Sequence, residues 1–382
     1  MTYEHIEIKD ICKIKSGKRL PKGTDFADGK TNYPYIRARD IKAGVINGDD
    51  LVYLTEDVQK RIQKYIVNTN DIVITIVGAS VGDVGYVKSE FDGFNLTENA
   101  VRLTDFNERV NSQYLLYVLN SKKYWELMQQ IAGGSAQPKL GIYKIESIPL
   151  ELPPIEVQNR IVEILTSYDD LIENNQKQIK LLEEAAQRLY KEWFVDLRFP
   201  GYENVAVVDG VPEGWHRGLL KELINVNYGK DHKKAPDDGN IPVYGSGGLM
   251  RKCNKSLFNG EAVLIPRKGS LNHIMYVNEE FWTVDTMFYA TMKREYTAPF
   301  VYFFISGFDM YSMNIGAAVP SMTVKILDAM DVVIPSDKLF REFDDVAQVF
   351  FRRIAALRRQ NEELGQARDY LLPKLMSGEL EM

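Results

Sequence analysis

The segment GSAQPKLGIYKIESIPLELP at residues 134–153 recurs in altered form as GAAVPSMTVKILDAMDVVIP at residues 316–335. Each copy ends at a proline, and behind each proline apolar residues recur at alternating spacings of four and three. Such a pattern, kept for nearly five heptads, is typical of long coiled-coil-type helices. Because proline tolerates only the first turn of a helix, we expect helices to begin close behind residues 153 and 335.

The similarity extends outward from this segment over the rest of the chain. Gly17-Lys18 matches Gly229-Lys230, residues 71–87 align without a gap on 261–277, and an apolar helix at 113–125 matches 299–311. The separation between matching residues only falls along the chain, from 212 to 182. A duplication with short length differences gives such a steady trend, whereas chance matches would scatter.

The repeat predicts two domains, each followed by a helical region, which suits a length of 382 residues. We predict a first domain at 1–154, a helical region at 155–198, a second domain at 199–336 and a second helical region at 337–382. Each domain combines short β-rich runs, turns rich in Gly, Asn and Asp, and at least one helix. The fold class expected is therefore α+β with a pseudo-twofold internal repeat.

The two apolar helix stripes should bury against each other, or else against another molecule. An antiparallel pair with matched ends would separate the two domains and would place Trp193 opposite Phe343 and Asn175 opposite Asn361. A buried asparagine pair can fix the register of two helices. The alternative is that both asparagines are exposed at a loose seam.

Charge and composition restrict the possible functions. The net charge of −6 argues against simple electrostatic binding to nucleic acid, yet residues 1–42 hold ten Lys or Arg against six Asp or Glu, and residues 230–270 hold eight against four. A nucleic-acid surface would thus be confined to patches. No apolar stretch approaches the ~20 residues of a membrane span, and the acidic N-terminus is unlike a secretory signal. The two cysteines lie in separate domains, so we expect no disulfide between them. This fits a reducing compartment, and a cytoplasmic location is expected.

Four segments together resemble the specificity subunits of type I restriction–modification systems: YIRARDI (35–41), GSAQPKL (134–140), IEVQNRIVEIL (155–165) and ARDYLLPKLMSGELEM (367–382). The resemblance covers the whole chain. It implies a non-catalytic protein with two target-recognition domains, which bind the two halves of an asymmetric sequence in double-stranded DNA. It also implies two modification subunits, which methylate adenine with S-adenosylmethionine, and restriction subunits, which hydrolyse ATP and use Mg. No cofactor is expected on this chain.

Candidate DNA-binding residues of the first domain lie in basic or glycine-rich turns. Arg37 and Arg39 alternate on YIRARD, which would place both on one face of an extended segment; DNA contact is favoured for Arg37, and pairing with a carboxylate is equally plausible for Arg39. Gln137 and Lys139 become Val319 and Ser321 in the second copy, so any loop contact with DNA there should differ between the domains. The full set is Lys18, Arg19, Lys22, Arg37, Arg39, Ser80, Gln137 and Lys139.

The second domain offers a similar set, in which Arg251 and Arg267 are favoured because arginine can bind guanine through two hydrogen bonds. Lys233 and Lys234 would contact phosphates or serve solubility only. Tyr244 would pack on a sugar or base, or belong to a half-buried core. The full set is Lys230, Lys233, Lys234, Tyr244, Ser246, Arg251, Lys252, Arg267 and Lys268.

Sequence motifs for catalysis are weak. An adenine methyltransferase needs a motif of the Asn-Pro-Pro-Tyr type, and the closest string, NYPY at 32–35, fails at its second position. No Walker A sequence occurs, and the histidines show no metal-ligand spacing. Two alternatives stay open: a DNA-modifying enzyme that acts alone, and a coiled-coil scaffold that binds only protein. The basic turns in both domains favour the DNA-binding interpretation.

Overall fold

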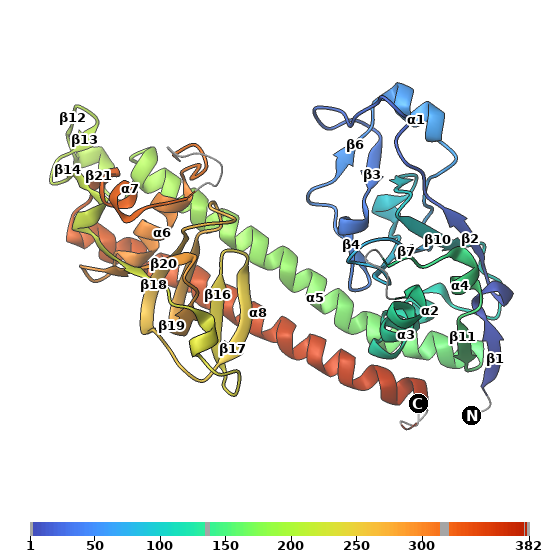
Figure 1. Cartoon of the computed structure of the whole chain (residues 1–382). Helices are drawn as coiled ribbons and strands as arrows, with labels where there is room; N and C mark the ends of the chain where they lie inside the picture. The colour runs from blue at the N-terminus through green and yellow to red at the C-terminus, as the bar shows by residue number, and fades with distance from the viewer. Residues whose placement is uncertain (1–2, 134–137, 314–320, 378, 380–382) are drawn as a thin grey trace. The chain divides into compact units, whose positions relative to one another are not determined.

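The computed structural model describes residues 3–133, 138–313, 321–377 and 379. Its contacts fall into two compact units (Figure 1): unit 1 is Met1–Ile172 with Glu363–Met382, and unit 2 is Glu173–Glu362. Two long helices, α5 (Ile155–Tyr190) and α8 (Asp337–Ser377), contribute to both units. Each unit therefore contains one domain and a part of each long helix.

The first domain is built around a four-stranded antiparallel sheet in the order β2-β10-β7-β8. Smaller sheets are β6-β3-β9, β1-β11 and β4-β5. The strands are β1 (Glu4–Glu7), β2 (Lys13–Ser16), β3 (Pro34–Ile36), β4 (Ile41–Lys42), β5 (Val45–Ile46), β6 (Val52–Tyr53), β7 (Ile72–Thr75), β8 (Val84–Tyr86), β9 (Asn95–Leu96), β10 (Ala100–Thr104) and β11 (Pro149–Leu152).

Helices α2, α3 and α4 share a core with this sheet and with the long helices, whereas α1 packs in a smaller cluster with Tyr35 and Leu54. Thr55 caps α1 and Asn111 caps α2 through side-chain oxygens that accept backbone N–H groups. The core of unit 1 joins α2 to Ile161 and Leu165 of α5 and to Leu375 of α8. The helices are α1 (Glu56–Ile62), α2 (Ser112–Asn120), α3 (Lys122–Ala132) and α4 (Ile142–Glu146).

The second domain is built around a six-stranded sheet in the order β15-β20-β18-β19-β16-β17. Two short antiparallel pairs, β14-β21 and β12-β13, accompany it. The strands are β12 (Val207–Val208), β13 (Val211–Pro212), β14 (His216–Leu219), β15 (Ile224–Tyr228), β16 (Ile241–Gly245), β17 (Gly248–Cys253), β18 (Phe258–Pro266), β19 (Met275–Thr283), β20 (Met287–Met292) and β21 (Asp331–Ile334). The helices are α6 (Ala298–Ser306) and α7 (Val324–Asp328).

The two domains share one strand order, which confirms the predicted α+β repeat. The sheet β2-β10-β7-β8 corresponds to β15-β20-β18-β19, with antiparallel pairing throughout both. One parallel pairing also recurs: β3 pairs with β9, and β16 pairs with the end of β19. A parallel pair in an otherwise antiparallel arrangement is a specific feature, so the two copies have kept the same fold.

The gapless alignment of 71–87 on 261–277 is wrong by one residue over the first strand. Ile72 pairs with Tyr86, whereas the residue that pairs with Tyr276 is Val263 rather than Ala262. Under the corrected alignment Gly78 matches Gly269, and both adopt a positive φ, 99° and 86°. A left-handed turn that only glycine adopts readily marks the equivalent position more reliably than apolar similarity does.

The long helices run antiparallel where they meet in unit 2. The rings of Trp193 and Phe343 lie 5.7 Å apart, and Asn175 donates to Asn361 over 2.9 Å. Asn175 is buried and also donates to Gln360, so the interpretation of a loose, exposed seam is wrong. That this pair fixes the register stays a prediction.

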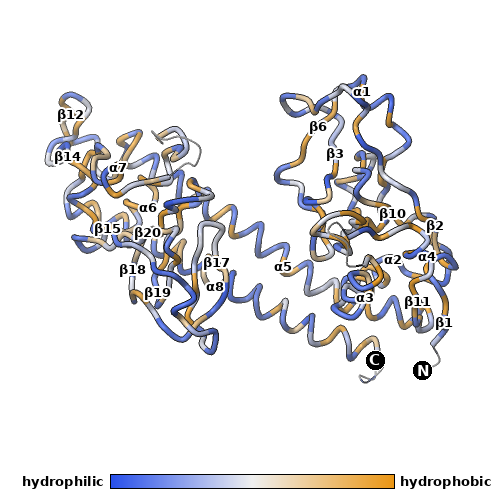
Figure 2. Tube along the Cα trace, in the orientation of Figure 1, coloured by the Kyte–Doolittle hydropathy of each residue, from blue (hydrophilic) through white to orange (hydrophobic). Residues whose placement is uncertain are grey.

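Hydrophobic and hydrophilic residues alternate along both long helices, as Figure 2 shows. In unit 1 the apolar stripe brings Ile161 and Leu375 into one core, and in unit 2 it brings Trp193 and Phe343 into another. Beyond Tyr190 the first helix continues as a π-helical turn over Lys191–Val195. Among the described residues, no helix combines the length and the apolar character that a membrane crossing requires.

Candidate nucleic-acid interface

In the second domain, three loops that carry candidate residues converge on one short segment, Thr283–Thr286, which we call the 283–286 segment. Lys230 donates its backbone N–H to Thr283 over 2.9 Å, and Val284 donates to the carbonyl of Tyr244 over 3.0 Å. Arg267 donates to Thr286 over 2.8 Å. The basic turn after β15, the YGSGG turn after β16 and the turn after β18 therefore meet at one edge of the sheet, which we call the second-domain loop edge.

The first domain repeats this arrangement at residues 96–99. Lys18 donates to the carbonyl of Leu96 over 2.8 Å, Thr97 donates to that of Ile36 over 3.0 Å, and Ile76 donates to that of Asn99 over 2.7 Å. The turns after β2, β3 and β7 therefore meet at a first-domain loop edge. Lys18 in the first domain and Lys230, Tyr244 and Arg267 in the second, which are scattered in the sequence, thus lie at equivalent edges of two related sheets.

A glycine is required where the first of these loops leaves the sheet. A Cβ atom on Gly17 would lie 1.9 Å from the carbonyl oxygen of Thr97, and one on Gly229 would lie 2.0 Å from that of Val284. Such distances are far below any van der Waals contact. These two glycines are therefore explained by close backbone approach within the protein, and the lysine that follows each is exposed at the loop edge.

The exposed cations of the first-domain loop edge differ in how they are held. Lys18 places its ammonium group 5.4 Å from the ring centroid of Tyr65, whereas Arg19 donates to Glu98 over 2.7 Å. Lys22 and Lys139 are exposed. The backbone of Lys139 forms an antiparallel β-bridge with Val77, which joins the loop of Lys139 to the same edge. Ser80 is half-buried in the turn after β7, and Gln137 lies outside the described residues.

The expected extended arrangement of Arg37 and Arg39 is wrong, because Ala38–Asp40 forms a 3-10 turn. Arg37 is only 18% exposed, and its Nε and Nη2 atoms donate to the carboxylate of Asp40 over 2.9 and 2.8 Å. Arg39 is 64% exposed and pairs with exposed Asp50. Arg37 therefore braces its own turn, and Arg39 is the more accessible of the two for an outside ligand.

Arg251, one of the two favoured arginines of the second domain, is also committed within the protein. Its side chain is 22% exposed and pairs with Asp237. It also donates to the carbonyls of His232 and, over 2.7 Å, of Ala235. These bonds close the loop before β16 against β17, so the geometry assigns Arg251 a structural role in this state.

Arg267 has a different environment. Its guanidinium lies 5.6 Å from the ring centroid of Tyr228, which is 55% exposed and packs edge-on against Phe288. A guanidinium held over an exposed ring keeps its donors available for a base or phosphate. Sequence reasoning missed Tyr228, although its position directly before Gly229-Lys230 was a usable signal.

The YGSGG turn packs against the turn after β18. The backbone carbonyl of Ser246 lies 3.0 Å from Nδ1 of His273, and a Cβ atom on Gly269 would lie 2.6 Å from the Oγ atom of Ser246. Tyr244 is half-buried and donates to Glu279 over 2.6 Å, and burial raises the pKa of its phenol above the usual range. The half-buried interpretation of Tyr244 is therefore the one that the structure supports.

The lysines of this edge are all exposed. Lys233 and Lys234 lie on a short 3-10 turn whose cap, Asp231, accepts the backbone N–H of Lys233 over 3.0 Å. Exposed lysines on a capped turn suit phosphate contacts, which position a protein on DNA without reading sequence. Three other candidate lysines are exposed: Lys230 and Lys268 lie in turns that converge here, and Lys252 lies on β17 opposite Pro242.

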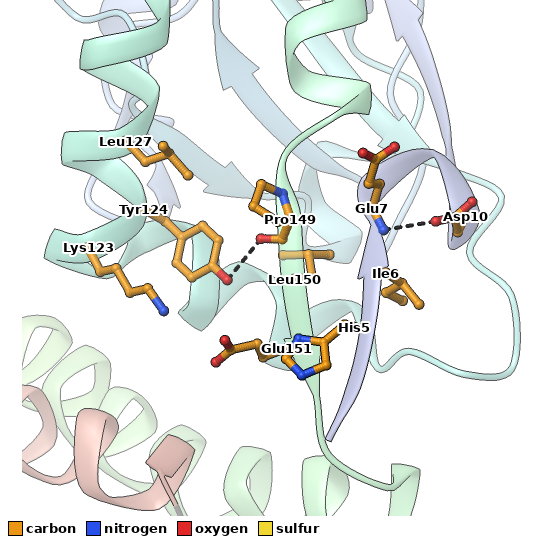
Figure 3. A pocket seen from close by; sticks show the side chains of 10 residues that line it. All are labelled: His5, Ile6, Glu7, Asp10, Lys123, Tyr124, Leu127, Pro149, Leu150 and Glu151. Atoms are coloured by element: carbon orange, nitrogen blue, oxygen red, sulfur yellow. Dashed lines mark hydrogen bonds between the residues drawn. The ribbon is translucent and has the colours of Figure 1, made fainter. Parts of the chain in front are cut away.

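A separate pocket of about 400 Å³ lies beside β1, β11 and α3 in the first domain (Figure 3). Its walls carry both signs of charge, from Glu151, Glu7 and Lys123. Tyr124 donates to the carbonyl of Pro149 over 3.1 Å and closes one side. None of the candidate residues from the sequence lines this pocket, so it is not a part of the loop edges.

Comparison with known families agrees with these features. The family model described as "Type I restriction modification DNA specificity domain" matches residues 1–184 and again residues 212–364. The two matches fall on the two copies of the repeat.

Individual relatives give the same assignment. The chain is 24% identical over 419 residues to the MjaIX specificity subunit of a type I restriction enzyme from Methanocaldococcus jannaschii, covering 98% of this chain and 92% of that protein. It is 28% identical over 154 residues to the EcoBI specificity subunit from Escherichia coli, covering 40% and 31%. The fold matches the crystal structure of a type I system S subunit from M. genitalium with a TM-score of 0.60 at 17% identity, over 98% of this chain and 96% of that one. The chain belongs to the type I restriction–modification DNA specificity family.

Proposed function

We propose that this chain reads an asymmetric, bipartite sequence in double-stranded DNA, with one half bound at each loop edge. The observation that carries the proposal is the convergence of three loops on residues 96–99 in one domain and on the 283–286 segment in the other. One frame with two different sets of loops is suited to two different half-sites. Sequence readout needs side chains at base edges, and Arg39 and Arg267 are the best-placed arginines for it.

The helix pair is proposed to act as the spacer between the two half-sites. The 36 residues of α5 correspond to about 54 Å at 1.5 Å per residue. In DNA-binding proteins with two reading elements, the spacing of half-sites follows protein geometry. Asn175 and Asn361 would keep this spacing constant by opposing a shift of one helix along the other.

The chemistry is proposed to lie in partner subunits. Relatives named as specificity subunits of type I restriction enzymes support a role in which this chain selects the site. Two modification subunits would methylate adenine with S-adenosylmethionine, and restriction subunits would cleave with ATP and Mg. This chain would supply recognition and would hold none of these cofactors itself.

The test is to express the chain with its modification subunits and to map methylated adenines in the host genome. We expect one split motif with two unlike halves and a constant spacer. A gel-shift titration of the purified complex should then favour a duplex with that motif over a scrambled one. Methylation by this chain alone would indicate an enzyme, and a complex with no preference among duplexes would indicate a protein scaffold.

A further inference from the structure

The hairpin between β16 and β17 exposes two large apolar side chains in succession. Leu249 is 51% exposed and Met250 is 54% exposed. Successive residues of a regular strand point to opposite faces, so one of such a pair would ordinarily be buried. Here a bulge intervenes: Tyr244 pairs with Leu249 and Val243 with Arg251, which leaves Met250 as the extra residue. The strand is thus irregular at the point where both side chains reach the surface.

The tip of this hairpin is fixed in place. Gly245 pairs with Gly248 across the turn, and Ser246 between them contacts His273. The other side is tied down as well, because Thr283 donates its hydroxyl to the carbonyl of Tyr244 over 3.1 Å. The two apolar side chains are therefore half exposed on a braced turn, and the sulfur of Met250 lies against Gly245.

Several exposed lysines surround the tip, although exposed Asp285 also lies on the 283–286 segment. Exposed Lys252 lies two residues beyond Met250 on the same strand. Lys268 donates its backbone N–H to Thr286, and Lys230 donates to Thr283, which places both at the 283–286 segment beside the tip. Cations around an apolar projection suit a ligand that has a polyanionic exterior and an apolar interior. A DNA duplex, with phosphates outside and stacked bases inside, is such a ligand.

We propose that Leu249 and Met250 form a wedge that inserts between neighbouring base pairs in the half-site bound by the second domain. The proposal rests on the proposed function and adds how one half-site is read. Apolar side chains pushed between bases unstack a step and bend the duplex, and the cost of this depends on the sequence. The wedge would therefore select for a flexible step, such as a pyrimidine–purine step, without any hydrogen bond to a base.

The wedge would act on one half-site only. In the first domain, β3 occupies the position of β16, but it pairs with β6 and β9 and leads directly into the 3-10 turn at Ala38–Asp40. At this point that domain presents Arg39 in place of an apolar hairpin, while Arg37 is held by Asp40. The duplication therefore predicts a bend at one end of the target and charge-based contacts at the other.

The test uses the full complex with its modification subunits and duplexes that carry the mapped motif. 2-Aminopurine, whose fluorescence rises when it is unstacked, replaces each adenine of the second half-site in turn. The variant is Leu249→Ala with Met250→Ala, and the matched control is Val207→Ala with Val208→Ala, which removes exposed apolar groups from the β12-β13 hairpin. We expect a fluorescence rise at one step with the wild type and the control, and none with the variant.

Affinity gives a second readout. Losing the burial of one such side chain weakens binding by about 10- to 100-fold, so the double variant should bind the motif at least about 10-fold more weakly than the wild type does. A duplex with a mismatch at the unstacked step should restore much of the variant's binding, because its stacking is already disturbed.

Normal affinity of the variant, or the absence of any unstacked step with a wild type that still selects its motif, would overturn the wedge alone. A wild-type complex with no motif preference would overturn the proposed function itself. A variant that fails to assemble with the modification subunits would identify the hairpin as a protein contact and would also overturn the wedge.

Discussion

The two domains sit on their long helices through different chemistry at corresponding positions. In unit 1, Tyr117 of α2 donates to Asp169 of α5 over 2.5 Å, and Arg368 of α8 donates to the same carboxylate over 2.6 Å. In unit 2, the residue that corresponds to Tyr117 is Phe303, and it stacks on Phe351, which corresponds to Asp169, with ring centroids 5.8 Å apart. We call this contact between each domain and its long helices the seat of the unit. The seat of unit 1 is a hydrogen-bonded ion pair, whereas the seat of unit 2 is a stack of rings.

The difference extends deeper into each seat. Ile161 in unit 1 corresponds to Phe343 in unit 2, and both are fully buried. Phe343 contacts the rings of Trp193 and Phe194, whereas the core that contains Ile161 is mainly aliphatic and includes Tyr114, Tyr117 and Tyr124. The two copies of the backbone thus share their geometry, while the packing is aliphatic and polar in unit 1 and aromatic in unit 2. The comparison predicts that the two units lose stability through different perturbations.

The largest expected effect comes from Phe343→Ala. Removing a buried ring from a packed core costs about 3–5 kcal/mol. Because Phe343 belongs to the core of unit 2, hydrogen exchange should accelerate in residues 199–336 while the first domain stays protected. Exchange measured by mass spectrometry on the purified chain, together with denaturant unfolding, would test this.

The matched control for Phe343→Ala is Ile161→Ala, which should accelerate exchange in the first domain instead. Its expected cost is about 2–5 kcal/mol, because it also leaves a cavity in a core. Equal acceleration in both units with either variant would show that the units unfold as one, and the comparison would lose its basis.

Arg267→Ala tests the difference between the two loop edges. Losing an arginine that contacts a guanine costs about 1–3 kcal/mol and relaxes the sequence at that position only. We expect the second half of the methylated motif to become degenerate while the first half is kept. Arg251→Ala is the comparison variant, and it should lower thermal stability because Arg251 braces the loop before β16. Unchanged methylation motifs with Arg267→Ala would remove this residue from the interface.

Arg368→Ala tests the polar seat of unit 1. The half-buried Asp169 would lose its charged partner, at a cost of about 1–2 kcal/mol, since the site is partly open to solvent. The stability of the wild type should fall with added salt more than that of the variant, because salt screens the ion pair. Tyr117→Phe is a milder control that removes one hydrogen bond and keeps the ring. Identical salt dependence of wild type and Arg368→Ala would contradict a contribution from this pair.

The sequence predicted the features that depend on spacing. The helix stripes, the repeat and the opposition of Asn175 to Asn361 follow from the periods at which residues recur. Periods survive duplication because each apolar side chain has to face the same core. The one-residue error between residues 71–87 and 261–277 arose because any run of apolar residues resembles another when shifted.

The acids that pair with individual arginines could not be predicted in this way. Arg37 and Arg251 appeared to be free cations, yet each is held by an acid, Asp40 or Asp237, on a nearby turn. Which of several acids pairs with an arginine depends on turn geometry that the sequence pattern does not encode. Tyr228 could have been noticed from its position before Gly229-Lys230, but its contact with Arg267 is set by the fold.

The smallest expected effect concerns Asp344, a buried acid of α8 whose counterpart in unit 1 is Val162. Burial raises the pKa of the Asp344 carboxyl above 3.8. The neighbouring carboxylates of Glu261 and Asp345 raise this pKa further. A hydrogen bond from Gln348 and the charge of Arg352 lower it in part. The folded protein therefore binds a proton more tightly at this site than the unfolded chain does. The stabilisation that results is complete below pH 3.8 and is lost as the pH rises from there through the raised pKa.

Asp344→Asn should accordingly stabilise unit 2 at neutral pH, because the amide keeps an oxygen for Gln348 and carries no charge. The expected gain is within about 1 kcal/mol, the usual size for one favourable substitution. Unfolding free energies measured between pH 4 and pH 7 should show wild type and variant converging toward the acidic end. The exposed neighbour Asp345 provides the control, and Asp345→Asn should change little. If the variant is less stable than the wild type at neutral pH, the charged carboxylate of Asp344 is an essential partner in the contact among Glu261, Tyr276 and Gln348. Unit 2 would then depend on a charge where it contacts its long helix, as unit 1 does.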